Sequence, residues 1–228
     1  IKIHFYLKGT ILAPEVREAK INDLLNKNTH DENCLSSFGV LNANGSKRMH
    51  EVNARILDPP VLNYNSSLPN KNGETFVKYG GWNMSNKRFI NTVELKKWII
   101  VWKAKLRKDK EEENKEKFND AARNSFSKCG LLLSQPIILT EPEQSIEDIF
   151  KLISVNYPNP QLVVFIIDEN DNDYNLIKNE AELKYGMTTQ CLKFSKLLEQ
   201  MRDDRKLDMY MSNVALKINA KIGGVNNT

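Results

Sequence analysis

The sequence contains no apolar run long enough to cross a membrane. A spanning helix needs roughly 18 to 20 consecutive apolar residues, and the longest uninterrupted candidates are WIIVW at 98–102 and LVVFII at 162–167. Runs of that length are typical of strands. We therefore expect no membrane partner for this chain.

Cysteine and histidine are both scarce. Cys34, Cys129 and Cys191 lie far apart, without a CxxC pair or a histidine at metal-ligand spacing, so neither a disulfide framework nor a zinc site is predicted. A reducing compartment fits this pattern, and we expect the cytoplasm, with the nucleus as the alternative. All three histidines lie within the first 50 residues, which excludes a histidine-based acid, base or metal centre from the rest of the chain.

Common nucleotide and metal signatures are absent as well. There is no GxGxxG, and the stretch GVLNANGSK at 39–47 has its second glycine one residue late for a phosphate loop. The acidic segment DENDND at 168–173 lacks the glycine and the final glutamate of a calcium loop, because Asp173 and Asn179 occupy those positions. We predict no metal and no cofactor, and we read the acidic segment as an exposed turn.

The composition is that of a folded protein. The 228 residues are 40% apolar and 27% charged, which argues against disorder and coiled coil. The formal net charge is only +4, so any recognition of phosphate has to be local. The first residues include neither an initiator methionine nor a secretory signal, and we expect a fragment of a longer protein.

The first part of the chain, residues 1–70, has irregular patterning. It predicts a helix near Pro14–Lys27, a strand pair over 37–57 with a hairpin turn at Asn44-Gly45, and extended backbone at Pro59-Pro60. We interpret this part as a linker segment with some structure.

From residue 71 onward, apolar strands alternate with helices. The predicted strands are WIIVWKA, LLLSQPIIL, QLVVFIID and TTQCLKF, and the predicted helices lie near 110–128, 145–155, 172–184 and 209–221. Strands that are apolar on both faces and alternate with helices indicate a mainly parallel sheet covered on both sides. The fold class is therefore α/β, a Rossmann-like three-layer domain. Ligands in such folds bind beyond the carboxyl ends of the strands, so we expect the site after QLVVFIID and TTQCLKF. The charged run KAKLRKDKEEENKEK is interpreted as a solvated helix face without a function.

A cluster of polar residues emerges from this layout. Tyr174 and Lys178 are four apart on a predicted helix, as are Lys217 and Lys221, so each pair shares a helix face. The amide residue of TTQC, Gln190, precedes Cys191 at the start of a strand. We expect the lysines and the amide to meet near a helix N-terminus. The last helix is apolar around its lysines, and a buried lysine without an anion is costly. The alternative is that these are ordinary surface lysines.

Several phrases resemble a known family. In this order and at these separations, ILDPPVLNYN, GGWNMSNKRF, KKWIIV, GMTTQC and LKINAKIGGVNN are similar to the linker and MID domain of a eukaryotic Argonaute. The resemblance covers nearly the whole chain. It implies that residues 1–70 are the L2 linker and residues 71–228 the MID domain, with the PIWI domain of the same parent chain as a partner.

The resemblance also implies a function, the binding of the 5′-monophosphate and first base of a small guide RNA in gene silencing. Tyr174 would stack on the first base and line the phosphate site, together with Lys178, Gln190, Lys217 and Lys221, and Cys191 would contribute its backbone N–H. A base-reading loop would consist of Asp168, Glu169, Asn170, Asp171, Asn172 and Asp173. Such a module is not an enzyme, and we expect this fragment to be monomeric and unable to cleave RNA.

The chain departs from the family pattern in three respects. The base-reading loop is acidic and lacks the glycine or proline that relatives often have, and Lys196 stands where relatives often have asparagine. We also expect this fragment to lack the PIWI domain, which in the family completes the pocket and carries the RNA-cleaving carboxylates. Two other functions stay open beside the first. One is a protein-interaction or scaffold module, and the other is a doubly wound enzyme that acts on a phosphorylated metabolite.

Overall fold

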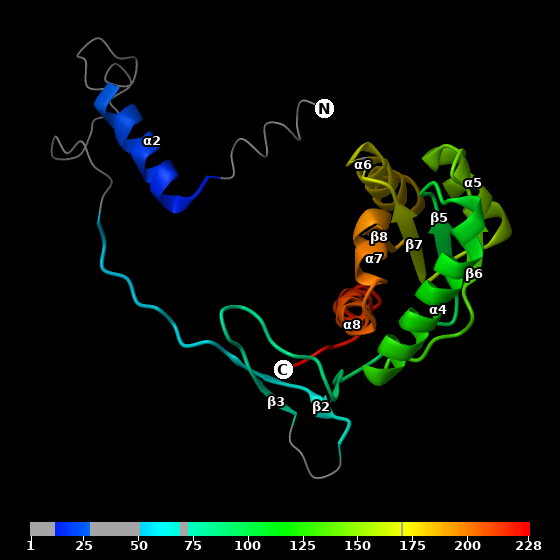
Figure 1. The fold of residues 1–228 in the computed structure, drawn as a ribbon, viewed down its shortest axis with the longest axis horizontal. Coiled ribbons are helices and arrows are strands. Elements are labelled where there is room, and N and C mark those ends of the chain that lie inside the picture. The colour runs from blue at the N-terminus through cyan, green and yellow to red at the C-terminus, as the bar shows by residue number, and fades with distance from the viewer. Residues whose placement is uncertain (1–11, 28–50, 69–72, 170) are drawn as a thin grey trace. The chain divides into compact units, whose positions relative to one another are not determined.

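The computed structural model describes residues 12–27, 51–68, 73–169 and 171–228. The chain divides into two compact units, Ile1–Asp58 and Pro59–Thr228, which are drawn together in Figure 1.

In the first unit the predicted helix is confirmed as α2, Pro14–Lys27. The predicted hairpin turn at Asn44-Gly45 lies outside the described residues. Residues 51–57, the end of the predicted strand pair, are exposed and form no strand, so that part of the prediction is wrong. The assignment of residues 1–70 as a linker stays a prediction. The second unit begins before residue 70, because β1, Val61–Asn63, pairs with β3, Glu74–Phe76.

The centre of the second unit is a four-stranded sheet. Its strands are β5, Trp98–Trp102, β6, Ile137–Thr140, β7, Leu162–Ile167, and β8, Thr189–Lys193. They lie in the order β6-β5-β7-β8, and all three neighbouring pairs are parallel. Every residue of β5 and β7 is buried, as expected for strands covered on both faces. The predicted parallel α/β architecture is confirmed.

Helices cover both faces of this sheet (Figure 1). The 3₁₀ helix η2, Lys108–Lys110, leads into α4, Glu111–Lys128, which packs with α7, Phe194–Gln200, and α8, Asp204–Lys221, over the face that carries Ile100 and Trp102. The opposite face, with Val101 and Phe165, is covered by α5, Ile146–Asn156, and by α6, Asp171–Asn179, together with its π-helical continuation η3, Glu180–Tyr185. No helix among the described residues combines the length and apolar character that a bilayer span requires.

Two strand or helix boundaries differ from the prediction, and one helix is additional. Only the second half of LLLSQPIIL forms a strand, since Pro136 has no N–H for the sheet ladder. The last helix begins at Asp204, because the Asp203 side chain accepts the N–H groups of Arg205 and Lys206 and so caps it. The short helix α7 was not predicted.

The end of the chain is bound to a small antiparallel region. Besides β1 and β3, β2, Asn65–Ser66, pairs with β4, Lys87–Arg88. Thr228 exchanges two backbone hydrogen bonds with Asn63, of 2.8 and 3.1 Å. The fully buried Asn219 lies against Gly224, where a Cβ would overlap its amide. Residues 223–227, GGVNN, therefore pack the C-terminal segment against α8.

Candidate functional site

The candidate site lies along the open edge of β8. The carbonyl of Thr188 accepts the N–H of Val163 in β7, and neighbouring residues of a strand direct their backbone groups to opposite sides. The backbone groups of Thr189 and Cys191 therefore face away from β7, and among the described residues no further strand follows β8 in the sheet. Unpaired edge groups of this kind need other partners.

Two lysine side chains meet at this edge. Lys178 donates from Nζ to the carbonyl of Thr189 at 3.3 Å and to its hydroxyl Oγ1 at 2.9 Å. Lys221 donates from Nζ to the same carbonyl at 2.8 Å. The two ammonium groups share this acceptor, so the distance between their Nζ atoms is at most the sum of the 3.3 and 2.8 Å distances to the Thr189 carbonyl. Of the three lysines that were expected to meet, these contacts join Lys178 and Lys221, which come from two helices distant in sequence.

Gln190 holds Lys221 in place. Its side-chain oxygen accepts from the Lys221 Nζ at 2.8 Å, and its amide nitrogen donates to the carbonyl of Cys191 at 2.8 Å. The residue is only 7% exposed, so its side chain has little freedom. Gln190 therefore fixes one ammonium group against the strand.

The cluster carries excess positive charge. Lys221 is exposed as a whole residue, but partial burial in the first place, and the neighbouring charge of Lys178 in the second, still lower its pKa. The only described ion-pair partner of Lys178 is Glu182, at 3.7 Å and largely exposed. Burial also raises the pKa of the Cys191 thiol to about 11, although both lysines oppose this. An anion at this edge would relieve the repulsion between the two ammonium groups.

Two further predicted residues flank the pair. Lys217 is exposed one turn before Lys221 on α8, and its charge also lowers the pKa of Lys221. Tyr174 lies one turn before Lys178 on α6 and is 46% exposed. Its ring is therefore accessible to a stacking partner. Lys196 is exposed on α7, and its role stays open.

The position of the cluster in the fold differs from the prediction. Lys221 lies in the last turn of α8, Lys178 lies just before α6 continues into η3, and Thr189 is the first residue of β8. The cluster is therefore at the amino end of β8, and Lys221 is near a helix C-terminus, where the helix dipole favours cations. The expected location beyond the carboxyl ends of the strands, at a helix N-terminus, is wrong for these lysines.

The predicted base-reading loop is shorter than expected. Asp171, Asn172 and Asp173 form the first turn of α6, where acidic residues are favourable because of the helix dipole. Of the residues before the helix, Asp168 accepts the backbone N–H of Lys105 at 3.2 Å. Glu169 accepts from Lys193 Nζ at 3.0 Å and from the hydroxyl of Ser195. Asn170 lies outside the described residues.

Thr189 is the residue that the sequence did not single out. It is 3% exposed, and both its carbonyl and its hydroxyl accept from the lysines. Within the described part of the chain, no group of three or more histidine, cysteine or acidic side chains could hold a metal ion.

Comparisons with known proteins agree with this fold. Residues 161–228 match the sequence model of the Piwi domain. Protein argonaute 5 of Arabidopsis thaliana is 30% identical over 224 residues, which cover 96% of this chain and 21% of that protein. Protein argonaute 4B of Oryza sativa subsp. japonica is 29% identical over 228 residues, which cover 93% of this chain and 22% of that protein.

Solved structures show the same architecture. The crystal structure of the Arabidopsis thaliana AGO5 MID domain superposes with a TM-score of 0.52 at 26% identity, and the match covers 62% of this chain and 97% of that one. The structure of Kluyveromyces polysporus Argonaute with a guide RNA, at 23% identity, shares the fold with a TM-score of 0.56 over 85% of this chain and 23% of that one.

These matches define the class of protein. The parallel sheet with its two helical layers is the Rossmann-like fold of a MID domain. The homologues of this chain over most of its length are Argonaute proteins, and its fold is consistent with a MID domain. It spans about a fifth of the length of the curated relatives that it matches.

Proposed function

We propose that the second unit binds the 5′-monophosphate and the first base of a small guide RNA, as a non-catalytic module of an Argonaute protein. The observation that carries this proposal is the convergence of Lys178 and Lys221 on the Thr189 carbonyl, beside the buried Gln190. A guide RNA is present in the Kluyveromyces polysporus relative. In this chain, RNA binding is our inference from the family and from the charge of the cluster.

The chemistry of the cluster suits a terminal phosphate. Such a phosphate has about −1.5 to −2 charges at pH 7 and three acceptor oxygens, more than an internal phosphodiester. Lys178, Lys221 and the nearby Lys217 supply cationic donors, and the Cys191 backbone N–H lies on the same open edge of β8. Charge-assisted hydrogen bonds are roughly twice as strong as neutral ones. The cluster would thus distinguish the 5′-terminal phosphate of an RNA from its internal phosphodiesters.

The first base would stack on Tyr174. Stacking of a base on an aromatic ring contributes about 1–3 kcal/mol and tolerates any base. The side chains of Asp168 and Glu169 are engaged by neighbouring residues, so backbone groups of this segment are the candidates for reading the base. We further propose that the PIWI domain of the same parent chain completes the pocket, in the cytoplasm or the nucleus.

The direct test is a titration with a nucleoside 5′-monophosphate, monitored by NMR chemical shifts of the 228-residue chain. We expect a Kd on the order of 0.1 mM to several mM, because the pocket is open to water. The matching nucleoside and the 3′-monophosphate are the controls, and both should bind more weakly. Equal binding of the nucleoside would remove the phosphate from the proposal and would favour the protein-interaction module.

A further inference from the structure

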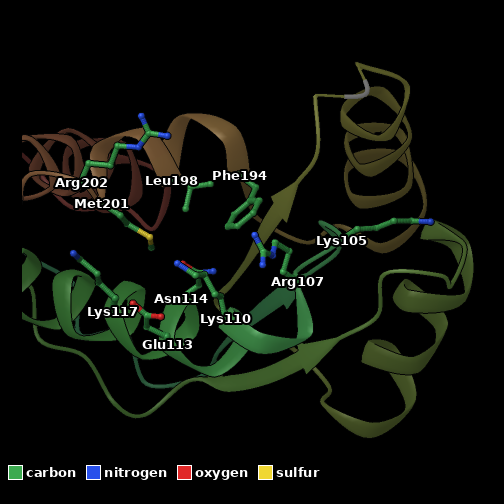
Figure 2. A pocket seen from close by; sticks show the side chains of 10 residues that line it. All are labelled: Lys105, Arg107, Lys110, Glu113, Asn114, Lys117, Phe194, Leu198, Met201 and Arg202. Atoms are coloured by element: carbon green, nitrogen blue, oxygen red, sulfur yellow. The ribbon is translucent and has the colours of Figure 1, made fainter.

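A cleft separate from the lysine cluster lies between α4 and α7. It has a volume of about 420 Å³, and Figure 2 shows the ten side chains that surround it, which are Lys105, Arg107, Lys110, Glu113, Asn114, Lys117, Phe194, Leu198, Met201 and Arg202. Lys105 and Arg107 follow the carboxyl end of β5, and Phe194 follows that of β8. The cleft is thus at the edge of the sheet where open α/β folds bind their ligands, and the lysine cluster is at the other.

The charges around the cleft are mostly positive. Five lining side chains are cationic, and Glu113 is the one acidic side chain among them. Lys105, Arg107 and Lys117 have acidic neighbours outside the cleft, in exposed ion pairs that contribute little. Lys110 and Arg202 form no ion pair with any other described residue. The cleft therefore presents surplus positive charge to a ligand.

The cations are spread along the cleft. Lys110, at the N-cap of α4, and Lys117, within α4, are seven residues apart, which is about 10 Å along the helix axis. In Figure 2 Arg107 lies at the end of the cleft near Phe194, whereas Lys117 lies toward Met201 and Arg202. A single phosphate would need converging donors, as at the edge of β8. The distribution here fits an extended anionic ligand.

The apolar wall indicates what kind of ligand this is. Phe194 and Leu198 project from α7 and Met201 follows its last residue, and Leu198 is 39% exposed. The Phe194 ring already packs edge-on against Trp102, with centroids 6.1 Å apart, so it is restricted as a platform for a base. Aliphatic and thioether side chains suit the apolar anchors of a peptide, and Met, Phe and Arg are enriched in protein interfaces. These features favour a peptide over a nucleic acid.

We propose that the α4–α7 cleft is a docking site for an acidic peptide segment of a partner protein. Aliphatic or aromatic side chains of the peptide contact Phe194, Leu198 and Met201, and its carboxylates pair with Lys110 and Arg202 at the rim. The charged run that contains Lys110 and Lys117 is then part of a binding surface, contrary to its interpretation as a helix face without a function.

The experiment is a selection of short random peptides displayed on phage against the 228-residue chain. The consensus of the enriched peptides is then synthesised with a fluorescent label and titrated by anisotropy. We expect a consensus in which Asp or Glu alternates with apolar residues. Failure to enrich any peptide, or a consensus without acidic residues, would overturn the proposal.

Charge-reversed variants assign the selected peptide to the cleft. The double variant Lys110→Glu with Arg202→Glu should weaken binding roughly tenfold or more. Lys110 is at the N-cap of α4, where a negative charge is favourable, so the fold should tolerate the change, and circular dichroism checks this. If it does not fold, Lys110→Gln with Arg202→Gln replaces it. The matched control is Arg123→Glu, exposed on α4 but not in the cleft.

A swapped peptide and an RNA complete the design. A peptide with lysine at each acidic position should bind the double variant better than it binds the original chain. Unchanged binding of the acidic peptide to the double variant would show that it binds elsewhere. A single-stranded RNA with a 5′-hydroxyl is the second probe. If the cleft variants abolish RNA binding and leave peptide binding intact, the cleft is a nucleic-acid site and the proposal is wrong.

Discussion

The substitution Lys221→Met tests the candidate site most directly. It removes one of the two ammonium groups that share the Thr189 carbonyl and keeps the length of the side chain. A charge-assisted hydrogen bond is worth about 1.5–3 kcal/mol, so binding of a nucleoside monophosphate should weaken roughly tenfold to a hundredfold. Because the original affinity is expected in the millimolar range, the variant should show no saturable binding.

The same substitution should change stability only slightly. Gln190 loses the ammonium partner of its buried oxygen, at a cost of about 1–3 kcal/mol. The repulsion from Lys178, which is at most about 6 Å away, is removed at the same time, and it amounts to about 0.7 kcal/mol in water and about 3 kcal/mol at an effective dielectric constant of 20. These two effects oppose each other, so we expect a net change within about 1 kcal/mol, or roughly 4 °C in Tm.

The assays are NMR titration for binding and differential scanning calorimetry for Tm. The matched control is Lys206→Met, an exposed position on the same helix outside the cluster, which should leave both quantities unchanged. Binding of the monophosphate by Lys221→Met within twofold of the original chain would refute the assignment. A fall in Tm of more than roughly 10 °C would show that the ammonium group has a structural role instead.

Three further predictions concern pH, thiol reactivity and packing. Because burial and the charge of Lys178 hold the pKa of Lys221 below 10.5, NMR titrations at increasing pH should show phosphate binding weakening before ordinary lysines deprotonate. Lys221 keeps its proton to higher pH in the unfolded chain than in the folded one, so its contribution to folding stability should rise with pH between its folded and unfolded pKa values. Urea denaturation of the original chain and of Lys221→Met at several pH values would measure this. If the free energies of unfolding of the two proteins changed with pH in parallel, both statements would be contradicted. With a pKa of about 11, Cys191 should react with iodoacetamide near pH 8 roughly a hundredfold more slowly than a free cysteine, and peptide mass spectrometry would reveal equal labelling if this is wrong. Gly224→Ala should lower the free energy of unfolding by about 1–3 kcal/mol because of steric overlap, whereas Gly81→Ala, with its nearest atom at 3.6 Å, should have no such effect in the same denaturation assay.

The sheet was predictable because its strands have a strong local pattern. The runs that form β5 and β7 are apolar at every position, and Ser145 precedes the helix α5 as a cap whose hydroxyl accepts the Asp148 N–H. The start of α8 was missed because it depends on the cap formed by Asp203 and not on apolar periodicity. Pro136 could be read from the sequence, but that β6 begins only after it depends on the pairing of β6 with β5.

The meeting of Lys178 and Lys221 could be expected from the sequence, but its geometry could not, and the roles of the site residues stay predictions. The spacing of four residues brought attention to Lys178 and Lys221. Their meeting point is a backbone carbonyl, and any residue at position 189 would supply one, so no side-chain pattern indicates it. The direction of α6 and α8 relative to β8 decides which end of the strand the lysines reach, and this follows from the packing of the whole unit. The α4–α7 cleft depends in the same way on the placement of α7.

The paired ends of the second unit have a mechanical consequence. Thr228 is hydrogen-bonded to Asn63, which lies a few residues after the start of the unit at Pro59. A tension applied between the two ends would load this short antiparallel contact first, and its bonds would open one after another. The four parallel strands would bear none of the force until the contact had separated, so single-molecule stretching should record a weak early event before the rupture of the sheet.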